Sequence, residues 1–129
     1  MPEPIPKKRN KKRGPSIKSL DTDFSKLVRS VGVCEIGKVE NCPSGNLQCA
    51  HGFSRRYKSV RWDRRNAFSA CAGCHYWYTL HPIEWDDFLR GVWGPVLYDE
   101  LRELSLQVVK VDLRAVSADL KESLKELAA

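Results

Sequence analysis

The sequence has no long apolar run and no apolar stretch near its start, and each absence removes a class of protein. It lacks the roughly eighteen consecutive apolar residues of a candidate membrane span. Its first residues are basic and rich in proline, unlike a secretion signal, so we expect a cytoplasmic protein. No internal repeat is visible, and 129 residues suffice for one domain, so we look for a single site.

Cysteine is the residue type that says most about that site. The five cysteines are an odd number in a chain expected to stay reduced, where clustered thiols more often bind metal than each other. Cys71 and Cys74 form a C-x-x-C pair, a spacing that presents two thiolates to a tetrahedral zinc ion at about 2.3 Å. Cys34 and Cys42 are the predicted partners, although the gap between them is longer than usual. Cys49 is the alternative ligand, or else a buried thiol.

Positive charge is concentrated in two blocks that point to a polyanionic partner. Residues 51–65 carry six basic side chains against one acid, and residues 1–18 carry seven against Glu3. Because neutralised phosphates release counterions, such blocks favour nucleic acid, with a solvated charge run as the alternative for the first block. The residues predicted to contact DNA are Lys7, Lys8, Arg9, Lys11, Lys12, Arg13, Arg55, Arg56, Lys58, Arg61, Arg64 and Arg65.

Hydrophobic spacing and turn residues predict an α+β fold in three parts. These are a flexible basic N-terminal arm (1–19), a zinc-stapled core (20–93) and a C-terminal helical pair (94–129). The leucine stripe of the last helix packs either on the core or on a second copy, as a homodimer. The expected elements are a helix over 21–31, strands over 47–53 and 59–62, a helix ending near 80, and helices over 83–92, 97–108 and 113–127.

His51, Asn66 and His75 follow one another with His75 directly after the C-x-x-C pair. Here the sequence resembles the HNH, or ββα-metal, nuclease family, and more closely the phage recombination endonucleases called NinG or Rap. The resemblance is carried by LQCAHGFSR (47–55), RWDRRN (61–66) and CAGC (71–74), and extends loosely over residues 34–127. It implies a small zinc-stabilised ββα-metal core followed by C-terminal helices, in the host cytoplasm if a phage encodes the chain.

The resemblance also assigns roles to the three residues. His51 matches the general base that activates water, a role that suits an imidazole with an ordinary pKa of about 6.5. Asn66 matches the residue that orients the loop or the histidine. His75 matches a ligand of a catalytic Mg²⁺ or Mn²⁺ ion that polarises the scissile phosphate. The implied reaction is endonucleolytic hydrolysis of DNA, on branched recombination intermediates such as Holliday junctions or D-loops.

One position departs from the family pattern. Many HNH enzymes place Asp or His immediately before the general base as a second metal ligand, whereas this chain has Ala50. Asp63 or water is the expected substitute. The departure also favours the main competing interpretation, a zinc-containing DNA-binding protein without catalysis.

A further reading of Cys71-x-x-Cys74-His75 is the attachment motif of a c-type haem. That reading needs an oxidising compartment and a second axial ligand. The absence of a signal segment and the single methionine, Met1, argue against it.

Overall fold

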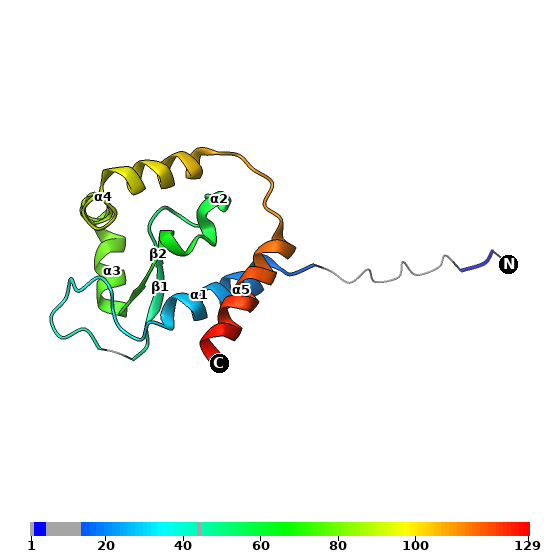
Figure 1. Cartoon of the computed structure of the whole chain (residues 1–129), viewed down its shortest axis with the longest axis horizontal. Coiled ribbons are helices and arrows are strands. Elements are labelled where there is room, and N and C mark those ends of the chain that lie inside the picture. Colours follow the sequence, from blue (N-terminus) through cyan, green and yellow to red (C-terminus); the bar gives the residue numbers. More distant parts are fainter. Residues whose placement is uncertain (1, 5–13, 44) are drawn as a thin grey trace.

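The computed structural model describes residues 2–4, 14–43 and 45–129, which form a small α+β fold (Figure 1). Among these residues, no helix is both long enough and apolar enough to cross a membrane. Six residues of the predicted basic arm lie outside the described part of the chain: Lys7, Lys8, Arg9, Lys11, Lys12 and Arg13.

A two-stranded antiparallel sheet lies at the centre of the fold. Strand β1 (Gln48–His51) pairs with β2 (Ala67–Ala70), so that His51 lies opposite Ala67 and Gln48 opposite Ala70. The strand predicted over 59–62 is wrong: that segment is the one-turn helix α2 (Lys58–Arg61), which buries Val60. All four residues of β2 are buried, so it lacks the alternation that marks a half-exposed strand.

Helix α1 (Ile17–Arg29) begins four residues before the predicted start, and crosses the predicted boundary at residue 19/20. Ser16 caps it by accepting a hydrogen bond from the backbone N–H of Ser19 at 3.0 Å. The earlier start brings Leu20 into the interior, where it is fully buried. Helix α1 covers one side of the sheet, and α5 (Leu113–Ala128) lies alongside α1 (Figure 1) and adds Leu120 to the core beneath it.

Two hydrophobic cores meet on β2. The first contains Leu20, Phe24, Val28, Ala67 and Leu120. The second contains Phe68, Leu89 and Tyr98, surrounded by Ile36, Phe53, Trp85, Phe88 and Trp93. Because successive strand residues point to opposite faces, Ala67 enters the first core and Phe68 the second.

The sheet is followed by helix α3 (Ala72–Leu80) and the long helix α4 (Pro82–Leu106). The predicted break at Gly94-Pro95 is confirmed, since Gly94 has φ 74° and ψ 169° inside α4. The C-terminal helices divide between the two sides of the molecule: α5 packs on α1, and α4 packs on α2 and α3. Leu113, Val116 and Leu120 of the leucine stripe contact the first core, while Leu127 at its end is exposed.

Candidate functional site

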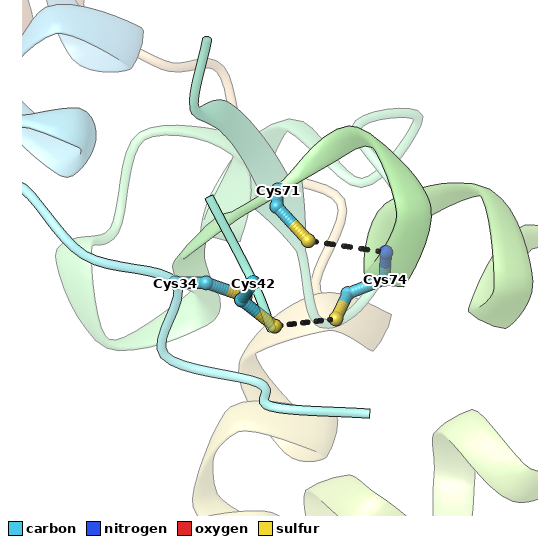
Figure 2. A group of neighbouring side chains, drawn as sticks. All are labelled: Cys34, Cys42, Cys71 and Cys74. Carbon is cyan, nitrogen blue, oxygen red and sulfur yellow. Dashed lines mark hydrogen bonds between the residues drawn. The ribbon is translucent and has the colours of Figure 1, made fainter. Parts of the chain in front are cut away.

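Four cysteines from two distant segments converge on one point. The sulfur atoms of Cys34, Cys42, Cys71 and Cys74 all lie within 4.8 Å of one another, and Figure 2 shows them facing a common centre. The Sγ atoms of Cys42 and Cys74 are 3.5 Å apart, far beyond the roughly 2.05 Å of a disulfide. All five cysteines are free thiols.

Local backbone geometry explains how each segment presents its sulfurs. Cys71 is the N-cap of α3, and its Sγ accepts the backbone N–H of Cys74 at 3.4 Å. The loop from Cys34 to Cys42 turns back through two left-handed residues, Gly37 (φ 64°) and Asn41 (φ 54°). Its Lys38 and Val39 N–H groups donate to Cys74 Sγ at 3.2 and 3.4 Å. The residues between Cys34 and Cys42 therefore supply backbone N–H groups that donate to the sulfur of Cys74.

These contacts set the protonation of the thiols. Burial acts to raise the pKa of Cys34, but N–H groups of Gly37, Cys71 and Ile36 lower it to about 6. The pKa of Cys42 is raised by hydrogen bonding to Cys74, and burial raises that of Cys74. Because thiolates are the form that binds a metal ion, binding of a divalent cation would release the remaining thiol protons.

The donor set fits a metal ion such as zinc. Four thiolates at about 2.3 Å from one tetrahedral ion would be about 3.8 Å apart, within the observed limit of 4.8 Å. Cys49 is not part of the cluster; burial raises its pKa to about 11, and it packs against the first core. Because Cys71 and Cys74 face two other sulfurs, they are not arranged to carry a haem.

His51 ends β1 with a fixed imidazole. Its Nε2 lies 2.9 Å from the carbonyl oxygen of Arg61, and its ring packs against Phe24 at 5.6 Å between centroids. A carbonyl only accepts, so Nε2 carries the proton and Nδ1 keeps a lone pair. Burial, and to a smaller extent the charge of Arg55, lowers the pKa of His51. The ring is therefore a neutral base at pH 7.

His75 lies on the first turns of α3 and is also held in one tautomer. Its Nδ1 donates to Oε1 of Gln48 at 2.7 Å, which leaves the lone pair on Nε2. Burial and then the positive charge of Arg55 lower its pKa as well. A neutral imidazole with one unprotonated nitrogen is the form that binds a metal ion.

The two imidazoles share a cleft. A hollow of about 510 Å³ is lined by both histidines, by Gln48, Cys49 and Arg55, and by residues of α1. A smaller hollow beside it is also lined by His51 and His75, with Ala50, Tyr78 and Trp85. The structure thus brings His51 and His75 together at one surface hollow.

Asn66 is fully buried and holds the loop that leads from β1 to α2. Its Oδ1 accepts the N–H of Phe53 at 2.7 Å, and its Nδ2 donates to the carbonyls of Phe53 and Val60. The fit is close: a Cβ on Gly52 would lie 2.9 Å from Oδ1 of Asn66 and 2.5 Å from Trp93. Asn66 therefore orients the loop and does not line the cleft.

Asp63 is not brought to the cleft. It caps the short 3₁₀ helix η1 (Arg64–Asn66) and forms an ion pair with Arg65 at 2.7 Å. The carboxylate that does line the cleft is Asp21 of α1, which is not among the site residues predicted from the sequence. Asp21 accepts from Nε and Nη2 of Arg61 and from Nε1 of Trp62. These bonds, led by that of Arg61, lower the pKa of Asp21.

The basic residues predicted to contact DNA fall into two groups. Arg61 pairs with Asp21, Arg64 with Glu35, and Arg65 with Asp63 and Glu100. Arg55, Arg56 and Lys58 are exposed and form no ion pair within the described residues. Arg55 lines the cleft, and Arg29 of α1, which the sequence pattern did not single out, lies there with it.

The cleft is not a closed metal site. Among the described residues, the four cysteines are the only set of three or more Cys, His, Asp or Glu side chains close enough to share one ion. In the cleft, Nε2 of His75 carries a lone pair and is therefore a possible ligand for a cation next to His51. Any further ligands would come from water or a bound phosphate.

Comparison with protein-family models, with curated proteins and with solved structures gives no match to this chain. A functional assignment therefore has to start from the chemistry of the cleft.

Proposed function

We propose that the chain is a metal-dependent endonuclease that hydrolyses phosphodiester bonds in DNA, with an HNH-type site. One observation carries the proposal: His51 and His75 line the same cleft, and each has one nitrogen fixed as a donor and the other left with a lone pair. A base and a metal ligand on opposite sides of a bound phosphate are what hydrolysis needs.

In the proposed reaction, Nδ1 of His51 takes a proton from a water molecule as the water oxygen bonds to phosphorus. The bond from phosphorus to the 3′-oxygen breaks, and that oxygen leaves with the electron pair and is then protonated by solvent. The hydrogen bond from Nε2 to Arg61 O stabilises the imidazolium that forms. The lowered pKa of His51 keeps it unprotonated before each turnover.

His75 would hold a Mg²⁺ or Mn²⁺ ion through Nε2. When bound, the ion supplies positive charge to the phosphate and the leaving oxygen. Arg55, whose charge acts on both histidines, would bind the same phosphate from the protein side.

A structural zinc ion would fix the relative positions of these groups. Cys71 directly follows β2 and caps α3, the helix that carries His75. The zinc cluster thereby fixes α3 against the strand pair that ends in His51. Together with the order strand, Asn66, strand and helix, this arrangement supports the HNH resemblance and gives zinc a structural role.

A cleavage assay with three histidine variants tests the proposal. Zinc-loaded protein with Mg²⁺ or Mn²⁺ should cut DNA, and His51→Ala should lose at least a hundredfold in rate while binding DNA equally. His75→Ala should lose activity that higher metal concentration partly restores. His81→Ala is the matched control, because His81 stacks on Trp77 between α3 and α4 and does not line the cleft. Full activity in His51→Ala would remove the mechanism.

Substrate preference follows only from the resemblance, which points to branched recombination intermediates. A panel of duplex, single-stranded, forked and four-way DNA, each with and without metal, tests it. Equal cutting of all forms would contradict a preference for Holliday junctions or D-loops.

A second function is favoured by one specific observation. Ala50 is buried and Asp21 is occupied by Arg61 and Trp62, so none of the described residues gives His75 a free carboxylate partner in the cleft. A zinc-stabilised DNA-binding protein without catalysis needs no such partner. Tight DNA binding with no cleavage under any metal would select this alternative.

A further inference from the structure

A second hollow extends the histidine cleft along helix α1. It has a volume of about 500 Å³ and shares Asp21, Ser25, Arg29 and Arg55 with the cleft. Beyond these residues it continues to Thr22, Lys18 and Ile17 near the start of the helix. The two hollows adjoin at these shared residues, and together they make a groove that leads from the two histidines to the N-terminal end of α1.

The helical period explains why α1 can line this groove. Leu20, Phe24 and Val28 recur every four residues and are buried against the first core. Lys18, Thr22, Ser25 and Arg29 recur every three or four residues on another face of the helix. That face spans about 16 Å at about 1.5 Å per residue, the length of roughly five stacked nucleotides at about 3.4 Å each.

The groove carries positive side chains that can bind an anionic ligand. Lys18, Arg29 and Arg55 are exposed, and none forms an ion pair with another described residue. The Nε of Arg29 donates to Ser25, which leaves its two terminal nitrogens for a ligand. The one acid in the groove, Asp21, is neutralised by Arg61 at 2.6 Å. The lining is otherwise polar, with Ile17 and Leu47 its aliphatic members.

We infer that this groove binds the phosphates of a single nucleic-acid strand, with Lys18 and Arg29 holding the phosphates that flank the one at His51 and His75. A row of separate cations with hydroxyl groups between them matches a linear polyanion rather than a compact anion. The inference rests on the proposed function, because it takes the histidine cleft as the site of the reacting phosphate. It assigns strand binding to α1, outside the basic block of residues 51–65.

Strand binding is measured without catalytic metal, so that it is independent of cleavage. The probe is a fluorescein-labelled twelve-nucleotide DNA strand, with an RNA strand and a duplex of equal length as further arms, and zinc-loaded full-length protein is titrated at several salt concentrations. The test variant is Lys18→Gln with Arg29→Gln. The matched control is Lys121→Gln with Lys125→Gln, which removes the same charge from the exposed surface of α5.

The groove variant should bind the DNA strand at least tenfold more weakly, and its log affinity should depend less steeply on log salt by about 1.4, for two lost phosphate contacts. The control should stay within about threefold of wild type. Thermal unfolding checks that both variants are folded. Equal losses in the two variants, or tighter binding of duplex than of either single strand, would overturn the inference. Equal binding of DNA and RNA strands would support a site that reads phosphates alone.

The same variants separate this inference from the nuclease proposal. If wild-type protein binds the strand through the groove but never cleaves it, the strand site stands and the nuclease proposal fails. If the protein cleaves DNA and the groove variant keeps wild-type KM and affinity, the nuclease proposal stands and the strand site fails.

Discussion

The Nε2 of His51 lies 2.9 Å from the main-chain oxygen of Arg61, and the side chain of that same arginine is held by Asp21 on α1. A carboxylate on one helix thus fixes the peptide group that orients an imidazole on the sheet. The arrangement makes Asp21 a positioning residue, since its carboxylate is occupied by Arg61 and Trp62.

Replacing Asp21 by Asn should lower kcat by about tenfold or more and leave KM nearly unchanged, because the orientation of His51 is loosened while the phosphate contacts remain. The charge of Asp21 also raises the pKa of His51, so the acid limb of the pH–rate profile should move to lower pH. Asp23→Asn, on the same helix but outside the cleft, is the control. An unshifted limb in Asp21→Asn would contradict this role.

The pH dependence of wild-type activity should reflect a buried neutral histidine. Burial and the charge of Arg55 lower the pKa of His51 from 6.5, while Asp21 and the carbonyl of Arg61 oppose the shift. Since the base acts unprotonated, activity should rise with pH through a midpoint below 6.5. Stability should change in the same direction, because the pKa of His51 is lower in the folded protein than in the unfolded chain. The stabilisation is fully present above the pKa of the unfolded chain and is lost as the pH falls through the pKa of the folded protein. Rates and unfolding measured between pH 4.5 and 8 test both statements.

Removing zinc should unfold the protein. Binding to structural four-ligand sites contributes on the order of 10 kcal/mol near neutral pH, comparable to the whole stability of a small domain. One zinc per chain is expected by elemental analysis, and a chelator should abolish the cooperative thermal transition. Cys34→Ser should lose the metal, whereas Cys49→Ala should retain it. Retention of zinc by Cys34→Ser would contradict the four-cysteine assignment.

Asn66→Ala should lower the free energy of unfolding by about 3 kcal/mol, because it leaves the N–H and carbonyl of Phe53 and the carbonyl of Val60 without their partner. Asn66→Asp should cost a similar amount, since a carboxylate cannot donate to those carbonyls. Urea unfolding monitored by tryptophan fluorescence measures both. A change below about 0.5 kcal/mol would mean that the loop is held by other contacts.

Gly52 and Gly91 should respond oppositely to alanine. A Cβ at Gly52 would lie 2.5 Å from the Trp93 ring and 2.9 Å from Asn66, so Gly52→Ala should destabilise by about 1–3 kcal/mol. Gly91 lies inside α4 with open space around it, so Gly91→Ala should be neutral or stabilise by up to about 1 kcal/mol. Thermal unfolding of the two variants under one condition provides the comparison.

The parts of the site that were predictable are those whose geometry is local. Cys71 and Cys74 lie within one turn at the start of α3, so their spacing alone brings their sulfurs together. Gly94 and Pro95 interrupt α4 because of their own backbone preferences. The sequence also predicted Cys34 and Cys42 as the other two members of the cluster, which the structure confirms. It left Cys49 as an alternative, because the choice depends on how the loop folds back onto α3. The second strand was assigned to the wrong segment because Ala67–Ala70 is buried by helices on both sides, and tertiary burial leaves no local pattern.

The sequence could not show which of the predicted DNA-contacting basic residues form ion pairs within the fold. Six basic residues within residues 51–65 look equivalent in sequence, yet Arg61, Arg64 and Arg65 pair with acids that lie at distant positions or are needed as caps. Arg29 is separated from Arg55 by 26 positions, and only the packing of α1 beside β1 brings them to one cleft. The sequence gives the number of basic residues, but ion pairs between distant segments determine which of them can still bind a ligand.

Ala67 and Phe68 are neighbours in β2 but belong to different cores. The four residues of β2 therefore join the first core, which contains Leu120 of α5, to the second core, which contains Leu89 and Tyr98 of α4. Heat, chelation and truncation of α5 should then all lead to the same denatured ensemble in one step. A shortened chain ending at residue 93 would lose Leu120 from the first core and Tyr98 from the second, so we expect no smaller autonomous unit to carry the histidine cleft.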